Sequence, residues 1–336
     1  MIKNNKFYID DIKNVVFLGF TDKFEELIKI NKSLNLKTSI ITGSDQSKSI
    51  KLKFPIKIFD KIDSKFESYI KKEFNIERTL FVNIAGRWIY NKKIIEKLFK
   101  FNLVNYHGAR LPLDAGSSSF TWKILRNDRI DNQLVHLVNE KIDNGPIIFS
   151  QKSLFPPHCK IPADFEKYTT DKLIEFYKKF IELIVKNKNF ELKFQTDYLG
   201  RYNPRLNTEQ NGWIDWSLSS FNLINFINAF DDPYTGSSTM ITNKKFNKVY
   251  IKKAHLHGGD SSNHPFMSGI ISRHDGKWLV VSTADQNMLL IEEVLDQNKK
   301  NIISSLKVGD RFYTPNEKLE KSKSYRVYYD PSGLKK

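Results

Sequence analysis

Apolar runs and helix-like stretches alternate through the first half of the chain. Four continuous apolar runs predict buried strands, at 14–20, 38–42, 80–85 and 103–107. Because these runs are apolar throughout rather than alternating, they are typical of parallel strands that are covered on both faces. The pattern predicts an α/β fold with a Rossmann-like, doubly wound sheet.

The stretches between these runs have helical character. They lie at 22–30, 91–99, 120–126 and 171–186. Asp22 stands where a side-chain acceptor would cap the first helix, and the serines at 117–119 stand before the third. These helices are expected to cover the predicted sheet.

The pattern changes in the second half of the chain. Residues 198–205 combine Gly and Pro with polar residues and predict a linker. A short helix at 221–230 is followed by predicted strands at 248–252, 268–272, 278–282 and 288–294. We therefore predict an α/β domain over 1–190, a linker over 191–206 and a smaller β-rich, barrel-like domain over 207–336.

Composition narrows the class of protein. Hydrophobic residues make up 40% of the 336 residues and charged residues 27%, as in ordinary globular proteins. The single cysteine, Cys159, permits neither an internal disulfide nor a Cys-based zinc site. No run approaches the roughly 20 apolar residues of a membrane span. We expect a cytoplasmic protein that has no membrane partner.

The chain carries 54 basic and 38 acidic residues, a net charge of +16. Such a balance can indicate nucleic acid, an anionic membrane surface or phosphorylated substrates. The excess is dominated by dispersed lysines, and no arginine-rich stripe with interleaved aromatics occurs. Generic surface lysine is the simpler interpretation, and no nucleic-acid partner is expected.

Three polar residues lie at the ends of predicted elements. Asn105 and His107 are two apart on one strand, so they face the same side near its carboxyl end. Asp143 begins a turn, 143–146, that leads into an apolar run at 147–149. An amide donor, an imidazole and a carboxylate suit acyl transfer to an amine. From spacing alone, hydrogen-bonded structural residues explain the three equally well.

The order of several longer motifs adds to this interpretation. Asn105-x-His107 is followed by a Trp-containing helix at 122–128, the run 135–138 and the turn and strand at 142–148. In the second half stand Gly-Trp-Ile-Asp-Trp at 212–216 and Ala-Phe-Asp-Asp-Pro-Tyr-Thr-Gly at 229–236. Together this ordered set resembles the 10-formyltetrahydrofolate-dependent formyltransferase family.

The resemblance implies roles for the three polar residues. His107 would be the general base, Asn105 would stabilise the oxyanion and Asp143 would orient His107. A folate pocket would be lined by residues of two segments, 86–89 and 139–145: Gly86, Arg87, Trp88, Ile89, Asn139 and Ile142. The co-substrate would be 10-formyltetrahydrofolate, with no metal.

The segment after His107 departs from the pattern of members that formylate the initiator tRNA. Those members follow the His with Pro-Ser-Leu-Leu-Pro and a basic loop, whereas this chain reads Gly-Ala-Arg-Leu-Pro-Leu-Asp-Ala-Gly-Ser at 108–117. The phrases at 230–234 and 264–266 more closely resemble the branch that formylates amino groups of nucleotide-linked sugars. Arg110 is a candidate for contacting such a substrate, although a structural arginine is the simpler interpretation.

The resemblance therefore favours a sugar N-formyltransferase. Its acceptor would be a dTDP-linked amino-dideoxyhexose, such as dTDP-4-amino-4,6-dideoxyglucose or a 3-amino relative, serving a cell-surface polysaccharide such as O-antigen. It also implies a homodimer. A methionyl-tRNA formyltransferase is the alternative, and a non-catalytic folate-binding or nucleic-acid-binding relative is the third possibility.

Overall fold

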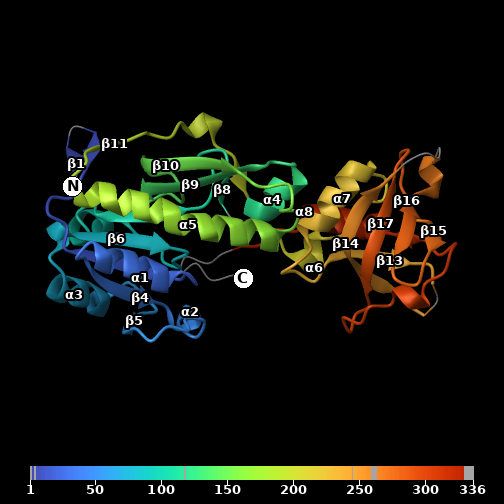
Figure 1. The fold of residues 1–336 in the computed structure, drawn as a ribbon, viewed down its shortest axis with the longest axis horizontal. Coiled ribbons are helices and arrows are strands. Elements are labelled where there is room, and N and C mark those ends of the chain that lie inside the picture. The colour runs from blue at the N-terminus through green and yellow to red at the C-terminus, as the bar shows by residue number, and fades with distance from the viewer. Residues whose placement is uncertain (1, 4, 117–118, 244, 259–262, 329–336) are drawn as a thin grey trace.

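A computed structural model describes residues 2–3, 5–116, 119–243, 245–258 and 263–328. An α/β part and a smaller β part lie next to each other along the long axis of the molecule (Figure 1). The first contains a mixed sheet and the second a curled antiparallel sheet. This architecture confirms the predicted fold class.

The central sheet of the α/β part has seven strands, in the order β10-β9-β7-β6-β3-β4-β5. Their bounds are β3 (Asn14–Gly19), β4 (Lys37–Thr42), β5 (Ile56–Ile58), β6 (Thr79–Ile84), β7 (Leu103–His107), β9 (Ile130–Leu137) and β10 (Ile147–Leu154). The strands from β5 to β7 are parallel, whereas β9 and β10 run antiparallel to their neighbours. The four predicted strands are thus confirmed as part of a parallel core.

Helices cover both faces of this sheet. One face carries α1 (Phe24–Ser33) and the long α5 (Pro162–Val185), and the other carries α3 (Ser64–Glu73) and the π-helical turn Ile94–Leu98. Successive residues of β3 are buried in alternate cores, because Val15 and Phe17 face α1 and α5 while Val16 and Leu18 face the other layer. Burial on both faces explains the continuous apolar runs.

Short elements complete the α/β part. They are β1 (Ile2–Lys3), β2 (Lys6–Phe7), α2 (Ser44–Ser47), the 3-10 turn Ile76–Arg78, β8 (Ala115–Gly116), α4 (Ser119–Leu125) and β11 (Phe190–Glu191). The strands β1, β2 and β11 form a separate small sheet.

Several helix boundaries differ from the sequence prediction. Asp22 does not cap α1, which begins at Phe24 with Lys23 in the cap position and no side-chain cap. Helix α5 begins at Pro162, nine residues before the predicted start, because Pro is compatible with the first turn of a helix. The predicted 91–99 helix is centred on a π-helical turn, and the cap candidates at 117 and 118 lie outside the described residues.

The interdomain segment (191–206) contacts the α/β part rather than crossing solvent. It contains the 3-10 turn Asp197–Leu199 and β12 (Tyr202–Asn203), which pairs in parallel with β8. The amide of Arg201 donates to the carbonyl of Pro112 over 3.1 Å. The Trp122 indole N–H also donates to the carbonyl of Pro204, at 2.8 Å. The segment predicted as a linker therefore lies against the loop that follows His107.

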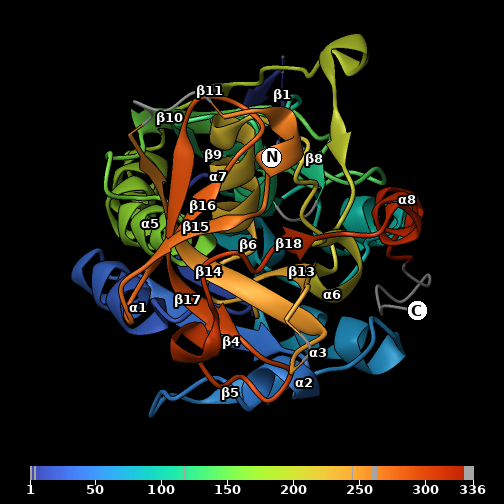
Figure 2. The ribbon, with the colours of Figure 1, turned by 90° about the vertical axis from the view of Figure 1, so that its right-hand side faces the viewer.

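The β part is built on six antiparallel strands in the order β15-β16-β17-β14-β13-β18 (Figure 2). Its strands are β13 (Ser237–Ile241), β14 (Lys248–His257), β15 (Ile271–His274), β16 (Leu279–Ser282), β17 (Met288–Leu295) and β18 (Phe312–Tyr313). Its helices are α6 (Thr208–Asn211), α7 (Ser220–Ala229) and α8 (Asn316–Ser324), with 3-10 turns at Pro265–Met267 and Ile303–Ser305. A bridge between Ile270 and Arg311 joins the two edges of the sheet, as a barrel-like fold requires.

The two parts meet through an apolar cluster. Ile124 of α4 and Phe165 of α5 pack in one buried group with Phe155 and with Phe230 at the end of α7. Among the described residues, none of the helices is long and apolar enough to pass through a membrane.

Candidate active site

The carboxyl ends of β6 and β7 open into a cleft of about 600 Å³. Asn83 on β6 and Asn105 on β7 are register partners, and both side chains line this cleft. His107 lines it as well, as expected for residues two apart on one strand. Ends of parallel strands are where open α/β sheets place their binding sites.

The cleft contains every residue that the sequence singled out for catalysis or folate binding. It is lined by Gly86, Arg87, Trp88, Ile89, Asn105, His107, Asn139, Ile142 and Asp143. Asp143, 36 residues after His107 in the chain, reaches the same cavity through the turn before β10. The structure thus brings the segments 86–89 and 139–145 and the end of β7 together around one cleft.

Arg110 does not line this cleft. Its Nη2 atom donates to Asp128 at 2.7 Å, and its Nε lies 3.6 Å from Asp114 Oδ2. The Arg110 guanidinium is therefore paired with two carboxylates. The expectation that Arg110 contacts substrate finds no geometric support.

A chain of hydrogen bonds fixes the amide of Asn105. The hydroxyl of Tyr90 donates to Asn83 Oδ1 at 3.1 Å, and Asn83 Nδ2 donates to Asn105 Oδ1 at 2.7 Å. Asn105 Nδ2 in turn lies 3.0 Å from Nε2 of His136. Because its Oδ1 is already an acceptor, the Asn105 amide presents N–H groups to His136 and to the cleft.

His136 ends this chain as a neutral imidazole. Its Nδ1 lies 2.8 Å from the carbonyl of Leu137, which can only accept, so Nδ1 carries the proton and Nε2 accepts from Asn105. Burial, followed by the proximity of His107, lowers the pKa of His136 to about 4. At neutral pH the second amide hydrogen of Asn105 remains available, with no partner among the described residues.

His107 and Asp143 face each other without a direct hydrogen bond. His107 Nε2 lies 3.8 Å from Asp143 Oδ2, and Asp143 Oδ1 lies 3.8 Å from His136 Nε2. His107 Nε2 is buried and has no hydrogen-bond partner among the described residues. The cleft therefore holds an imidazole nitrogen without a hydrogen-bond partner among the described residues, beside a carboxylate.

Asp143 is held from two sides. It adopts a left-handed backbone conformation, φ 54°, and its carboxylate accepts from the Gly116 amide at 3.3 Å. Gln195 Nε2 donates to the carbonyls of both Asp143 and Gly145 at 2.8 Å. The turn that carries the carboxylate is thus fixed by the loop after His107 and by the interdomain segment.

Two glycines permit close approach at the site. A Cβ on Gly86 would lie 2.0 Å from Asn83 Oδ1, and one on Gly145 would lie 1.7 Å from the carbonyl of Leu137. These backbones approach groups that orient Asn105 and His136. Only glycine fits at either position without displacing the hydrogen-bond chain.

The walls of the cleft combine apolar and polar groups. Ile89 and Ile142 are exposed apolar residues at its edge, while the Trp88 ring is buried and its indole N–H lacks a partner among the described residues. Arg87 Nη1 contacts Asp45 at 2.6 Å and Asp60 at 3.4 Å. The Arg87 side chain therefore forms ion pairs with two carboxylates at the wall of the cleft.

Sequence reasoning missed several lining residues. Asn83 is the polar position within the apolar run 80–85. His136 lies within the motif at 135–138. Tyr202 and Arg205 reach the cleft from the interdomain segment. For Asn83 and His136 the signal was a polar residue in a buried strand, which requires a hydrogen-bond partner.

The described residues offer no evident set of metal ligands. Within the described residues, no group of three or more His, Cys, Asp or Glu side chains could hold an ion.

Comparison with known proteins shows what the chain is similar to. Residues 207–307 match the formyl transferase C-terminal domain. The C-terminal part of the chain therefore resembles formyltransferases, and curated relatives extend this resemblance over most of the chain. Among curated relatives, the bifunctional polymyxin resistance protein ArnA of Wigglesworthia glossinidia brevipalpis is 27% identical over 207 residues, 61% of this chain. The chain covers only 31% of that protein's length.

A methionyl-tRNA formyltransferase of Mycoplasma capricolum is 25% identical over 269 residues, covering 75% of this chain and 78% of that protein. Among solved structures, an N-formyltransferase from Helicobacter canadensis, in complex with folinic acid and dTDP-3-aminofucose, has a TM-score of 0.61. It shares 19% identity over 84% of this chain and 99% of its own. A 4-N formyltransferase from Francisella tularensis has a TM-score of 0.58 at 18% identity, over 72% and 98% of the two chains. At these identities the two structures share the fold.

Proposed function

We propose that this protein is a formyltransferase that moves the formyl group of 10-formyltetrahydrofolate to the amino group of a dTDP-linked amino-dideoxyhexose. The observation that carries the proposal is the meeting of three groups at one cleft: an oriented amide N–H, an unpartnered imidazole nitrogen and a carboxylate. Two structural neighbours support the two substrates: an N-formyltransferase in complex with folinic acid and dTDP-3-aminofucose, and a sugar 3N-formyl transferase in the presence of dTDP and 5-N-formyl-THF.

The reaction assigns one task to each side chain. The sugar amine attacks the formyl carbon and forms the new C–N bond, and His107 takes the proton that the amine loses. The free N–H of Asn105 donates to the oxyanion that develops on the formyl oxygen. Asp143 stabilises the protonated His107, which returns a proton to the departing N10 of the folate.

The walls suit a folate donor. Ile89, Ile142 and the buried Trp88 offer apolar surface to a pterin and an aminobenzoyl ring, and the free indole N–H offers one donor. Tyr202 and Arg205 lie on the same cleft and offer an aromatic face and a positive charge to the nucleotide of the acceptor.

A competition between acceptors tests the proposal. The enzyme would be incubated with 10-formyltetrahydrofolate and dTDP-4-amino-4,6-dideoxyglucose, its 3-amino relative or charged initiator tRNA. Formylation of either sugar supports the proposal and identifies the amino position. Formylation of tRNA alone overturns it.

Methionyl-tRNA formyl transfer is the second candidate, because curated relatives carry that name and the net charge is +16. The salt dependence of binding and turnover distinguishes the two candidate functions. Binding to tRNA should weaken steeply as salt rises, through counterion release, whereas turnover of a nucleotide sugar should change little.

A further inference from the structure

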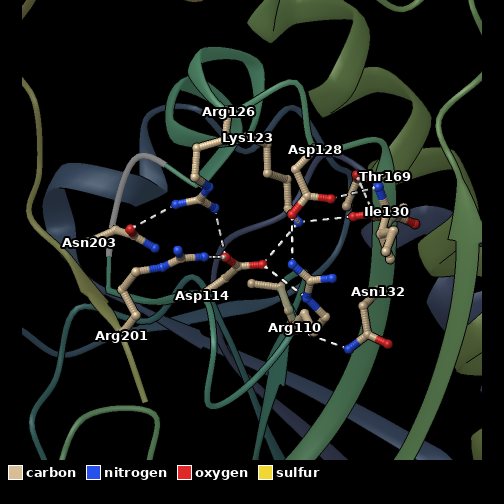
Figure 3. Close-up of polar contacts among 12 residues, drawn as sticks. Arg110, Asp114, Lys123, Arg126, Asp128, Ile130, Asn132, Thr169, Arg201 and Asn203 are labelled. Atoms are coloured by element: carbon tan, nitrogen blue, oxygen red, sulfur yellow. Dashed lines mark hydrogen bonds and ion pairs between the residues drawn. The ribbon is translucent and has the colours of Figure 1, made fainter. Parts of the chain in front are cut away.

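A group of charged residues, shown in Figure 3, surrounds a buried carboxylate, and none of them lines the cleft. We call it the Asp114 cluster, and its members are Arg110, Asp114, Lys123, Arg126, Asp128 and Arg201. At its centre the Asp114 carboxylate accepts from Lys123 Nζ at 3.1 Å and from Arg126 Nη2 at 2.8 Å. The side chains of Asp114 and Lys123 are both fully buried.

The cluster joins three segments that are distant in sequence. Asp114 belongs to the loop that follows His107, Lys123 and Arg126 extend from α4 and its end, and Arg201 comes from the interdomain segment. Arg201 Nη2 lies 3.7 Å from Asp114 Oδ1. Arg126 Nη1 also donates to Asn203 Oδ1, at 3.1 Å, so it contacts the loop and the interdomain segment together.

The loop leads from this cluster directly to the reacting groups. Two residues after Asp114, the Gly116 amide donates to the Asp143 carboxylate at 3.3 Å. Gly116 pairs with Asn203, and a Cβ on Gly116 would lie 2.5 Å from the Asn203 carbonyl. The neighbouring Tyr202 pairs with Ala115 and lines the cleft. Any displacement of the loop at Asp114 therefore moves contacts of both Asp143 and Tyr202.

Stability alone gives a weak reason for this arrangement. Burying a charged side chain costs several kcal/mol of desolvation free energy for each ion. Apolar residues of similar volume in place of a buried ion pair often give the same or a higher stability. The cluster gives Lys123 a second hydrogen bond, since Nζ also donates to the Ile130 carbonyl at 2.9 Å, and Asp128 Oδ2 lies 3.8 Å away. Charged hydrogen bonds of fixed direction define position more narrowly than apolar contacts do.

We propose that Asp114 and Lys123 are positioning residues for formyl transfer: they hold the loop after His107 so that the Gly116 amide meets Asp143 and Tyr202 stays on the cleft. This inference rests on the proposed function for its kinetic consequence. We expect that removing a charge from the Asp114 cluster makes both the loop after His107 and the Asp143 turn more mobile.

Two variants and a matched control test the proposal. Asp114→Asn removes the central charge and Lys123→Met removes the buried cation at similar length. The control is Lys252→Met, because Lys252 is the other buried lysine among the described residues and contacts Asp231 at 3.5 Å in the β part. Amide hydrogen exchange of the free enzyme and steady-state kinetics would be measured for all three.

The proposal expects faster exchange in 108–116 and 140–146 for Asp114→Asn and Lys123→Met only. It also expects kcat to fall about tenfold to a hundredfold with an unchanged KM for the folate donor. Lys252→Met should alter neither quantity. Unchanged exchange in 140–146, or faster exchange with wild-type kcat, overturns the proposal. If the wild type formylates no sugar, the proposed function fails, and exchange in 140–146 alone decides the positional coupling.

Discussion

Asn105 and His136 are register partners on β7 and β9, and the Asn105 amide donates to His136 Nε2 at 3.0 Å. The bond fixes which hydrogen of Asn105 is left for the cleft. His136→Phe removes the acceptor, so we expect kcat to fall about tenfold or more while the KM for the folate donor stays constant. His255→Phe, a half-exposed histidine on β14, is the control and should retain the wild-type kcat. Equal rates for the two variants would exclude this role for His136.

Removing the oxyanion donor should have a larger effect. For Asn105→Ala we expect kcat to fall by about 10²–10³, the usual loss for one such donor. Binding of the folate donor should persist, because the amide acts mainly in the transition state. Titration of Trp88 fluorescence with a folate analogue would report affinity. A lost affinity with intact kcat would assign Asn105 to binding instead.

The low pKa of His136 makes stability depend on pH. Its pKa is about 4 in the folded chain against 6.5 for the free side chain, so between these values the unfolded chain binds more protons. The free energy of unfolding therefore falls as pH drops from 6.5 toward 4, by up to about 1.4 kcal/mol per pH unit. Urea unfolding at pH 7.5 and pH 5 should show a smaller loss for His136→Phe than for the wild type. Identical losses would contradict the buried neutral imidazole.

The sequence predicted the parallel core and the principal groups of the cleft. Strands β3, β4, β6 and β7 were found because burial on both faces leaves a continuous apolar run. Strand β9 lacked this signal, since it buries polar residues that make tertiary hydrogen bonds. Asp131 accepts from Thr169 at 3.0 Å, and Asn132 Nδ2 donates to the Ala109 carbonyl at 3.0 Å. Those partners are distant in sequence and no local pattern marks them.

The interdomain segment shows the same limit. Gly and Pro near 200–204 indicated a chain break, and the local backbone is indeed irregular there. Its contacts with Gly116 and Asp143, like the ion pair of Asp114 with Arg126, join residues that come together only in the fold. Asp22 failed as a cap because the helix begins one residue later than its cap position would require.

Gly86 offers a test of the wall of the cleft. In Gly86→Ala the new Cβ would lie 2.0 Å from Asn83 Oδ1, so the Asn83 amide must move and release Asn105. We expect a loss of kcat comparable to that of His136→Phe. Gly258→Ala is the matched control, because none of the described residues has an atom within 4 Å of its Cβ position. A fully active Gly86→Ala enzyme would show that the Asn83 contact is dispensable.

Asp143→Asn keeps the shape of the side chain and the Gly116 contact while removing the charge. The 3.8 Å separation from His107 is short enough for the carboxylate to stabilise the protonated ring. We expect a folded protein that loses roughly 100-fold or more of kcat. Circular dichroism would verify folding. Turnover at the wild-type rate would remove Asp143 from the mechanism.

The central claim is tested most directly by mass spectrometry of the acceptor after incubation with 10-formyltetrahydrofolate. For the wild type we predict a dTDP-amino-dideoxyhexose that gains one formyl group, and for His107→Ala an unchanged acceptor. Formyl transfer to the sugar by His107→Ala at the wild-type rate would contradict the assignment of the base. If the wild type left both the 4-amino and the 3-amino sugar unmodified, the account as a whole would be contradicted.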